Sequence, residues 1–207
     1  MFGCICLRGI KMSDFLKTQI ASMGIEINDN QLNQFSHMLD LLAEWNQLHN
    51  LTRLKDRREQ EIYHILDALS ALKYFHEYNT VLDVGTGAGF PGVPLAIMCP
   101  EKHFHLVDSN GKKTAYLKQL VQHLNLNNVT VYHARAESLN LKDIDCVTAR
   151  AVANPDVIIN LTKSYKPKMY LLYIGPNCPD MHNANKIQLT VPFSEKKHYL
   201  FLLEQSN

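Results

Sequence analysis

Apolar residues in the first third of the chain recur every three or four positions, which is the spacing of one face of an α-helix. The pattern predicts three helices between residues 13 and 78. Ser13 or Asp14 can cap the first helix, and Asn28-Asp29 can cap the second. The predicted buried faces are Phe15, Leu16 and Ile20 in the first helix, Leu32, Phe35, Leu39, Leu42, Trp45 and Leu48 in the second, and Ile62, Ile65, Leu66, Leu69 and Leu72 in the third.

From residue 80 the pattern changes to short β-branched runs that alternate with helical segments. The predicted strands are residues 80–84, 103–107, 129–133, 144–149 and 169–174, and the predicted helices are 91–99, 111–125 and 155–165. Such alternation is typical of βαβ units, so we expect an α/β fold with a mostly parallel, Rossmann-like sheet. Residues 187–191 and 198–203 are expected to close the sheet as a C-terminal antiparallel hairpin.

These patterns divide the chain into three parts. Residues 1–12 contain a short apolar stretch followed by Arg8 and Lys11, which is not the layout of a secretory signal. Met12 precedes a good helix start, so we interpret residues 1–12 as an N-terminal extension and Met12 as the more natural initiator. Residues 13–78 are then a helical cap and residues 79–207 the α/β domain, together forming one compact unit.

Composition and charge exclude some classes of protein function. The chain has 207 residues, of which 46% are hydrophobic, and this is enough for one sizeable core. No apolar run approaches the length of a membrane span. The 21 basic and 20 acidic residues give a formal net charge of +1, which excludes a globally basic nucleic-acid clamp. A nucleic acid can still bind if basic residues gather on one face.

The cysteines contain no CxxC pair; they are Cys4, Cys6, Cys99, Cys146 and Cys178. We therefore expect neither a disulfide framework nor a metal site, and scattered thiols fit a reducing cytoplasm. Cys146 lies in an apolar run and is interpreted as a small buried hydrophobe rather than a nucleophile. We also expect the protein to be a monomer.

The stretch after the first predicted strand reads DVGTGAGFPG from Asp83. Its DxGxGxG spacing is typical of sites that hold S-adenosylmethionine, because Gly85, Gly87 and Gly89 let the backbone approach a ligand closely. Asp83 can orient the loop, or bind the ligand's amino group through water. A dinucleotide site would need GxGxxG, and Phe90 replaces the third glycine, which disfavours an NAD-dependent dehydrogenase.

Two further places extend the predicted cofactor site. Asp108 ends the second predicted strand, where a carboxylate can accept both ribose hydroxyls; capping of the next helix is the alternative. The third predicted strand leads into residues 133–137, where we expect the adenine. Ala136 and Glu137 would flank its amino edge, although Glu137 alone fits a solvated surface role nearly as well.

Several motifs together resemble a known family. They are Trp45-Asn46 with Asn50-Leu51-Thr52, HILD from His64, DVGTGAGFPGVPLA from Asp83, LVDSNGKK from Leu106, and Ala149-Arg150-Ala151. From Ser13 onward the chain is similar to the glucose-inhibited division protein B family, the guanine-N7 methyltransferases of bacterial 16S rRNA. The resemblance implies a class I S-adenosylmethionine-dependent methyltransferase with an N-terminal helical cap, acting on 16S rRNA or the small ribosomal subunit. It also implies that Gly85, Phe90, Ala136, Glu137 and Arg150 line the cofactor site.

The chemistry agrees with this resemblance. N7 of guanine carries a lone pair and no proton, so methyl transfer is an in-line displacement that needs no general base. Amino-directed methylation of adenine would call for an Asn-Pro-Pro-aromatic motif. The segment Asn154-Pro155-Asp156-Val157 fits better as a helix cap followed by proline at the first helical position.

Candidate RNA contacts are local groups of cations. Lys112 and Lys113, expected to point beyond Asp108, and Lys197 are the predicted RNA-binding residues. Lys197 stands where family members often have arginine, and Ile174 where they often have lysine. The remaining clusters are Arg53, Lys55, Arg57 and Arg58, then Lys118, then Lys163, Lys166 and Lys168, and finally Lys196.

Arg150, just past the fourth predicted strand, is the predicted catalytic residue. Its guanidinium can contact the cofactor carboxylate or the O6 edge of guanine, and a structural salt bridge is the alternative. His64 and Asp67 share one helix face, either as a local cap contact or to hold the helical cap over the site. Asn46 and Asn50 are expected to pin the cap to the catalytic loop.

Two other functions stay open at this stage. One is methylation of a small molecule or a protein, which a deep closed pocket would favour. The other is an RNA chaperone that binds the cofactor without turnover.

Overall fold

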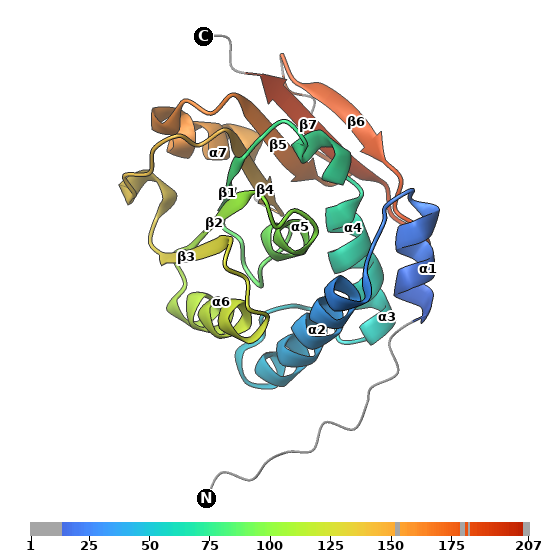
Figure 1. Ribbon diagram of the computed structural model, residues 1–207. Helices are drawn as coiled ribbons and strands as arrows, with labels where there is room; N and C mark the ends of the chain where they lie inside the picture. Colours follow the sequence, from blue (N-terminus) through green and yellow to red (C-terminus); the bar gives the residue numbers. More distant parts are fainter. Residues whose placement is uncertain (1–13, 152–153, 179–180, 182, 205–207) are drawn as a thin grey trace, which may run out of the picture.

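The computed structural model describes residues 14–151, 154–178, 181 and 183–204. The predicted extension, the possible cap Ser13 and the cysteines Cys4 and Cys6 lie outside these residues. Figure 1 shows a central sheet, whose seven strands have the order β3-β2-β1-β4-β5-β7-β6. The pairs among β1 to β5 are parallel, and β7 pairs antiparallel with both β5 and β6. The predicted α/β fold with a C-terminal antiparallel hairpin is therefore confirmed.

The strand order brings several strand ends together. The strands are β1 (Thr80–Val84), β2 (His103–Asp108), β3 (Val129–His133), β4 (Cys146–Arg150), β5 (Met169–Ile174), β6 (Asn185–Leu189) and β7 (His198–Glu204). Strand β1 lies between β2 and β4 and is parallel to both. The carboxyl ends of these three strands therefore lie side by side, at the edge where ligands bind in open α/β sheets. The sequence misplaces two strands, since β4 starts two residues later and β6 two residues earlier than predicted.

Helices cover both faces of the sheet. The longer ones are α1 (Asp14–Ser22), α2 (Asp29–His49), α5 (Gly92–Met98), α6 (Gly111–His123) and α7 (Pro155–Thr162). Asn28 caps α2 and Asn154 caps α7, as predicted. The predicted face of α2 is wrong at Leu48, which is 79% exposed. Leu48 lies about one turn beyond Trp45, which contacts Tyr116 and Gln119 of α6.

The predicted third helix is interrupted. It consists of α3 (Arg57–Gln60), a π-helical turn (Glu61–Leu66), α4 (Asp67–Leu69) and a 3-10 turn (Leu72–Phe75). π-Helical turns are rare and are found frequently at functional sites. Here the turn carries His64 and leads directly into Asp67.

Two apolar layers hold these elements together. The larger layer joins the helical segment to the sheet, since Phe35 and Leu39 of α2 belong to the same cluster as Phe104 and Leu106 of β2. The smaller layer lies under α7. Full burial of one such side chain contributes about 1.5–3 kcal/mol, so the helical segment and the sheet stabilise each other. Cys146 is completely buried in the larger layer, as predicted.

Candidate active site

The loop after β1 depends on backbone conformations that favour glycine. Gly85, Gly87 and Gly89 have φ angles of +65°, +63° and +91°. A Cβ on Gly89 would approach a methyl group of Leu117 to 2.9 Å. The loop therefore packs tightly against α6, while Gly85 at its start is exposed.

Asp83 is fully buried at the end of β1 and holds this loop. Its Oδ2 accepts hydrogen bonds from Thr86 Oγ1 (2.7 Å) and from the backbone N–H of Gly92 (2.9 Å). Its Oδ1 is also buried and has no hydrogen-bond partner among the described residues. Burial raises the pKa of Asp83 to about 6. The carboxylate therefore orients the loop, as the sequence suggested, and keeps one acceptor position unused.

Asp108 joins the glycine loop to the start of α6. Its Oδ2 accepts from the N–H of Gly87 (3.0 Å), and its Oδ1 accepts from the N–H of Asn110 (2.8 Å). Asn110, not Asp108, caps α6, so the capping alternative for Asp108 is excluded. The Lys113 ammonium lies 3.6 Å from Asp108 Oδ2. The expectation that Lys113 points beyond this carboxylate is wrong, because the ion pair draws it back.

The predicted adenine-binding residues lie on a short 3-10 turn, Ala136–Ser138, just after β3. Asp108 and His133 are paired across β2 and β3, so this turn starts beside Asp108. Tyr165 donates its hydroxyl to the carbonyl of Ala136 and thereby fixes the turn. Ala136 is buried and Glu137 is exposed, and their contact with a cofactor stays a prediction.

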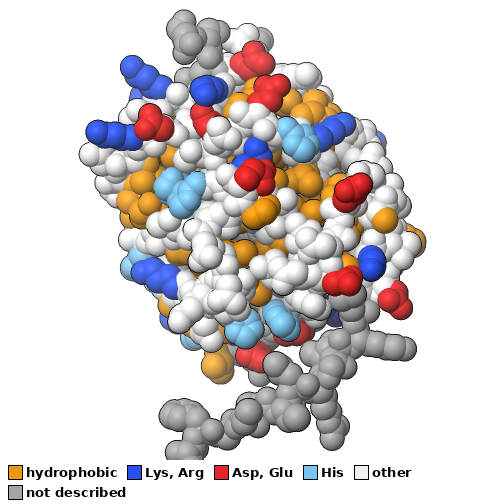
Figure 2. Space-filling view, in the orientation of Figure 1, with side chains coloured by type: hydrophobic (Ala, Val, Ile, Leu, Met, Phe, Trp, Pro, Cys, Tyr) orange, Lys and Arg blue, Asp and Glu red, His pale blue; other side chains and the backbone are white. Residues whose placement is uncertain are grey.

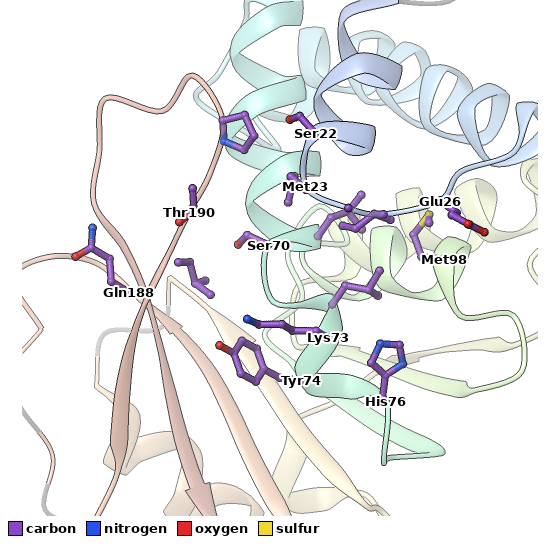
Figure 3. A pocket seen from close by; sticks show the side chains of 16 residues that line it. Ser22, Met23, Glu26, Ser70, Lys73, Tyr74, His76, Met98, Gln188 and Thr190 are labelled. Atoms are coloured by element: carbon purple, nitrogen blue, oxygen red, sulfur yellow. The ribbon is translucent and has the colours of Figure 1, made fainter.

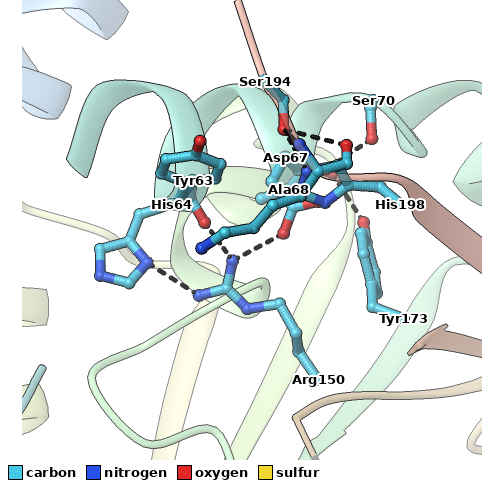
Figure 4. Close-up of polar contacts among 10 residues, drawn as sticks. Tyr63, His64, Asp67, Ala68, Ser70, Arg150, Tyr173, Ser194 and His198 are labelled. Carbon is cyan, nitrogen blue, oxygen red and sulfur yellow. Dashed lines mark hydrogen bonds and ion pairs between the residues drawn. The ribbon is translucent and has the colours of Figure 1, made fainter. Parts of the chain in front are cut away.

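Arg150, the last residue of β4, is the centre of a polar network (Figure 4). Its Nη1 donates to the carbonyl of Tyr63 (2.8 Å) and to Asp67 Oδ2 (2.9 Å), and its Nη2 donates to His64 Nδ1 (3.1 Å). The guanidinium carbon lies 5.1 Å from the centre of the Phe90 ring. The structure therefore brings together four predicted site residues from three separate stretches of the chain, His64 with Asp67, Phe90 and Arg150.

The sheet register also places Arg150 at the glycine loop. Asp83 of β1 lies opposite Thr148 of β4, so Arg150 emerges from the sheet at the level of Gly85. The ion pair with Asp67 supplies the salt bridge that the sequence left as an alternative. The arginine thus has a structural partner and also a position beside the predicted cofactor site.

His64 connects Arg150 to the end of α2. Its ring stacks on Phe90 with centres 4.2 Å apart, and its Nε2 lies 2.9 Å from Thr52 Oγ1. The N–H of Thr52 in turn donates to Asn46 Oδ1 (2.9 Å). Because Arg150 donates to Nδ1, the ring proton lies on Nε2. Burial and the charge of Arg150 lower the pKa of His64 to about 3, so the ring is neutral.

Asn46 therefore contacts the network through Thr52, as part of the expected link between cap and loop. Asn50 has a different role, since it ends α2 in the left-handed conformation with φ of +48°. Asparagine tolerates this conformation better than most residues.

Asp67 is nearly fully buried between Arg150 and a histidine that the sequence did not assign. Asp67 Oδ1 lies 2.7 Å from His198 Nδ1, and His198 Nε2 lies 2.6 Å from Ser194 Oγ. Burial alone would raise the pKa of Asp67, but the hydrogen bond from His198 and the charge of Arg150 hold it below its usual range. The one sequence signal for His198 was its place after Lys196-Lys197 at the start of the last strand.

The predicted RNA-binding cations differ in their surroundings. Lys112 and Lys197 are exposed, whereas Lys113 is paired with Asp108. Several other candidate cations form ion pairs within the protein: Arg57 with Asp40, Arg58 with Glu61, and Lys168 with Asp145. Figure 2 shows basic and acidic side chains interspersed on one face of the molecule.

A cavity of about 900 Å³ lies away from the glycine loop (Figure 3). It lies between the end of α1, the segment that includes Ser70 and Tyr74, and the end of β6, with Lys73, His76 and Gln188 in its lining. None of the predicted cofactor-binding residues lines it. Within the described residues no cluster of three or more histidine, cysteine or acidic side chains could hold a metal ion. No helix there is both long and apolar enough to span a membrane.

The sheet order and the glycine loop define a class I S-adenosylmethionine-dependent methyltransferase fold. An S-adenosylmethionine-dependent methyltransferase from Aquifex aeolicus matches with a TM-score of 0.55 and 20% identity, covering 74% of this chain and 96% of that chain. A human methyltransferase 10 domain containing protein matches with a TM-score of 0.56 and 12% identity, covering 83% and 97%. At these identities the likeness shows the fold.

Sequence comparison identifies the family. The model of the rRNA small subunit methyltransferase G family matches residues 31–206. A ribosomal RNA small subunit methyltransferase G from Dichelobacter nodosus is 32% identical over 206 residues, covering 96% of this chain and 98% of the relative. One from Wolinella succinogenes is 38% identical over 188 residues, covering 90% and 96%. The chain belongs to the rRNA small subunit methyltransferase G family, and the resemblance found in the sequence is confirmed.

Proposed function

We propose that the protein transfers the methyl group of S-adenosylmethionine to N7 of one guanine in the 16S rRNA of the small ribosomal subunit. The main structural support is the position of Arg150, which reaches the level of Gly85 and contacts Phe90 at the end of the glycine loop. The family assignment favours rRNA over a small molecule or a protein as the substrate.

The residues around the loop fit this cofactor. Asp83 Oδ1 is a buried acceptor without a partner, and the ammonium of a methionine moiety is the kind of donor it lacks. Asp108 offers a carboxylate at the end of β2 for ribose hydroxyls, and Ala136 and Glu137 follow β3 for the adenine. When bound, S-adenosylmethionine supplies a methyl group on a positively charged sulfur.

The remaining residues position the reacting groups and do not react themselves. His64 is neutral and bonded on both ring nitrogens, and Cys146 is completely buried. Attack by guanine N7 needs neither a base nor a nucleophile from the protein, so positioning can supply much of the rate, up to about 7–11 kcal/mol in favourable cases. Arg150 is suited to hold the O6 edge of the guanine, with Asp67 and His64 fixing its orientation.

We also propose the partner, the oligomeric state and the location of the enzyme. The substrate is 16S rRNA, free or within the small subunit, and the enzyme works as a monomer in the cytoplasm. The helical segment 13–78 serves as a cap over the α/β domain 79–207.

Transfer of a labelled methyl group to small subunits that lack the modification tests the proposal. Wild type should produce N7-methylguanine at one site, mapped by cleavage at the modified base. Arg150→Ala should lower kcat much more than it raises KM for the subunit, because the proposed contact is at the reacting base. Lys17→Ala, which removes an ion-paired cation outside the candidate RNA contacts, is the control and should keep wild-type kinetics. If wild type yields no N7-methylguanine, the proposed function is wrong.

A further inference from the structure

The turn between β6 and β7 exposes an aromatic ring next to two lysines. Phe193 is 69% exposed and has a φ of +60°, a conformation that residues other than glycine rarely adopt. Leu48, Val157 and Phe193 are the large apolar side chains recorded as exposed among the described residues, and only Phe193 is aromatic. Lys196 and Lys197 follow it and are exposed, together with the acidic Glu195.

Rings and cations alternate around this turn. The rings of Phe193 and of Phe15 in α1 meet in a T-shaped arrangement with centres 5.2 Å apart, and the Arg58 guanidinium lies 3.4 Å from the centre of the Phe15 ring. The Lys196 ammonium lies 4.5 Å from the centre of the Tyr63 ring. Arg58 also pairs with Glu61 at 3.2 Å, so its charge is partly neutralised. We call Phe15, Arg58, Tyr63, Phe193, Lys196 and Lys197 the Phe193 surface.

This surface is continuous with the candidate active site. Ser194, the residue after Phe193, bonds His198, and His198 bonds Asp67, which holds Arg150 (Figure 4). Tyr63 belongs to both, because its carbonyl accepts from Arg150 while its ring lies under Lys196. A strand of RNA with one base at Arg150 would therefore have neighbouring nucleotides within reach of Phe193.

We propose that the Phe193 surface stacks an unpaired base that neighbours the guanine to be methylated, an inference that rests on the proposed function. Exposed rings bind unpaired bases through their faces irrespective of sequence, and neighbouring lysines and arginines hold the phosphates. A single exposed ring followed in the chain by two exposed lysines suits a polyanion better than an apolar protein surface, which would need a larger apolar patch. In this proposal Lys197, a predicted RNA-binding residue, binds RNA next to Phe193.

The test compares Phe193→Ala, Phe193→Leu and Phe193→Trp in two assays. The first assay is methyl transfer to unmethylated small subunits. Alanine should raise KM about 5- to 150-fold, the range found for loss of one base–aromatic stack, and leucine should resemble alanine. Tryptophan should keep wild-type KM, and kcat should change little in all three. Leu48→Ala, which removes a similarly exposed apolar side chain, is the control and should keep wild-type KM.

The second assay measures binding of a short unstructured oligoribonucleotide and of the same sequence as a duplex. Wild type should prefer the single strand, and the alanine and leucine variants should lose that preference. Retained KM and preference in Phe193→Leu would mean that the ring only packs on Phe15 and would overturn the proposal. A raised KM with unchanged oligonucleotide binding would assign the ring to a ribosomal protein and would overturn it as well. Because wild-type turnover is measured in the same assay, failure of the proposed function would be seen separately.

Discussion

Gly85 has a φ of +65° and lies exposed at the end of β1, so a side chain there would meet both backbone strain and the predicted ligand. We expect Gly85→Val to abolish S-adenosylmethionine binding, measured by calorimetry, while the protein stays folded. Gly24→Val is a matched control, because Gly24 has a φ of +72° and open space around an added Cβ. Both variants should lose a similar 1–2 kcal/mol, roughly, of stability from the left-handed backbone. Unchanged cofactor affinity in Gly85→Val would contradict the loop assignment.

A second prediction at the residue scale concerns Asp83 and the pH dependence of the free energy of unfolding. Burial raises its pKa to about 6 from an ordinary value of 3.8. Between these values the folded protein keeps a proton that the unfolded chain has lost, so this group's contribution to the free energy of unfolding falls as pH rises, by about 3 kcal/mol.

The variant Asp83→Asn removes this pH dependence. Its amide oxygen can still accept from Thr86 and Gly92, so it should fold and should gain stability over wild type above pH 6. Its cofactor affinity should fall, because the unused acceptor position becomes a donor. Urea unfolding at pH 5 and pH 8 checks the first expectation, and calorimetry checks the second. A variant less stable than wild type at pH 8 would contradict the expectation that the buried charge of Asp83 lowers stability.

At the scale of elements, the π-helical turn 61–66 carries the neutral histidine His64. Its ring contacts Arg150 at the end of β4 and Phe90 at the end of the glycine loop. The unfolded chain would protonate His64 near pH 6.5, whereas the folded protein does so near pH 3. The free energy of unfolding therefore falls as pH drops below 6.5, by about 3 kcal/mol between pH 6.5 and 4 from this group.

His64→Phe should keep the stacking on Phe90 and lose that acid sensitivity. The difference in unfolding free energy between pH 6.5 and 4 should be smaller in the variant than in wild type. His37→Phe, which removes an exposed histidine of α2, should retain the wild-type difference. Equal differences for wild type and His64→Phe would mean that another group dominates acid unfolding.

The same elements show what the sequence could and could not predict. Long periodic segments such as α2 and α6 and the strand-end residues Asp83, Asp108 and Arg150 were predictable, because each signal is local. The π-helical turn was not predicted, and the contacts of its residue His64 are long-range, with Phe90 and with Arg150, the latter 86 residues away. His198 was missed for a similar reason, since only the pairing of β7 with β5 brings it to Asp67.

At the scale of the whole molecule, charge decides how RNA can be held. The net charge is +1, and Figure 2 shows both signs mixed on one face, so a general attraction to polyanions is weak. Ion pairs within the protein engage Arg57, Arg58 and Lys168. Binding must therefore come from a few placed cations, of which Lys112 and Lys197 are exposed.

Variants of the two lysines at the start of α6 can distinguish effects on RNA binding from effects on cofactor binding. Lys112 is exposed, whereas the Lys113 ammonium lies 3.6 Å from the carboxylate predicted to bind the ribose. Lys112→Ala should weaken binding of small subunits and lower the salt slope of log K by about 0.7–0.9, the value for one phosphate contact, with unchanged cofactor affinity. Lys113→Ala should change cofactor affinity as well, because Asp108 loses its neighbouring charge. Titrations of both ligands at several salt concentrations measure this, and identical behaviour of the two variants would show that the ion pair with Asp108 has no effect on either ligand.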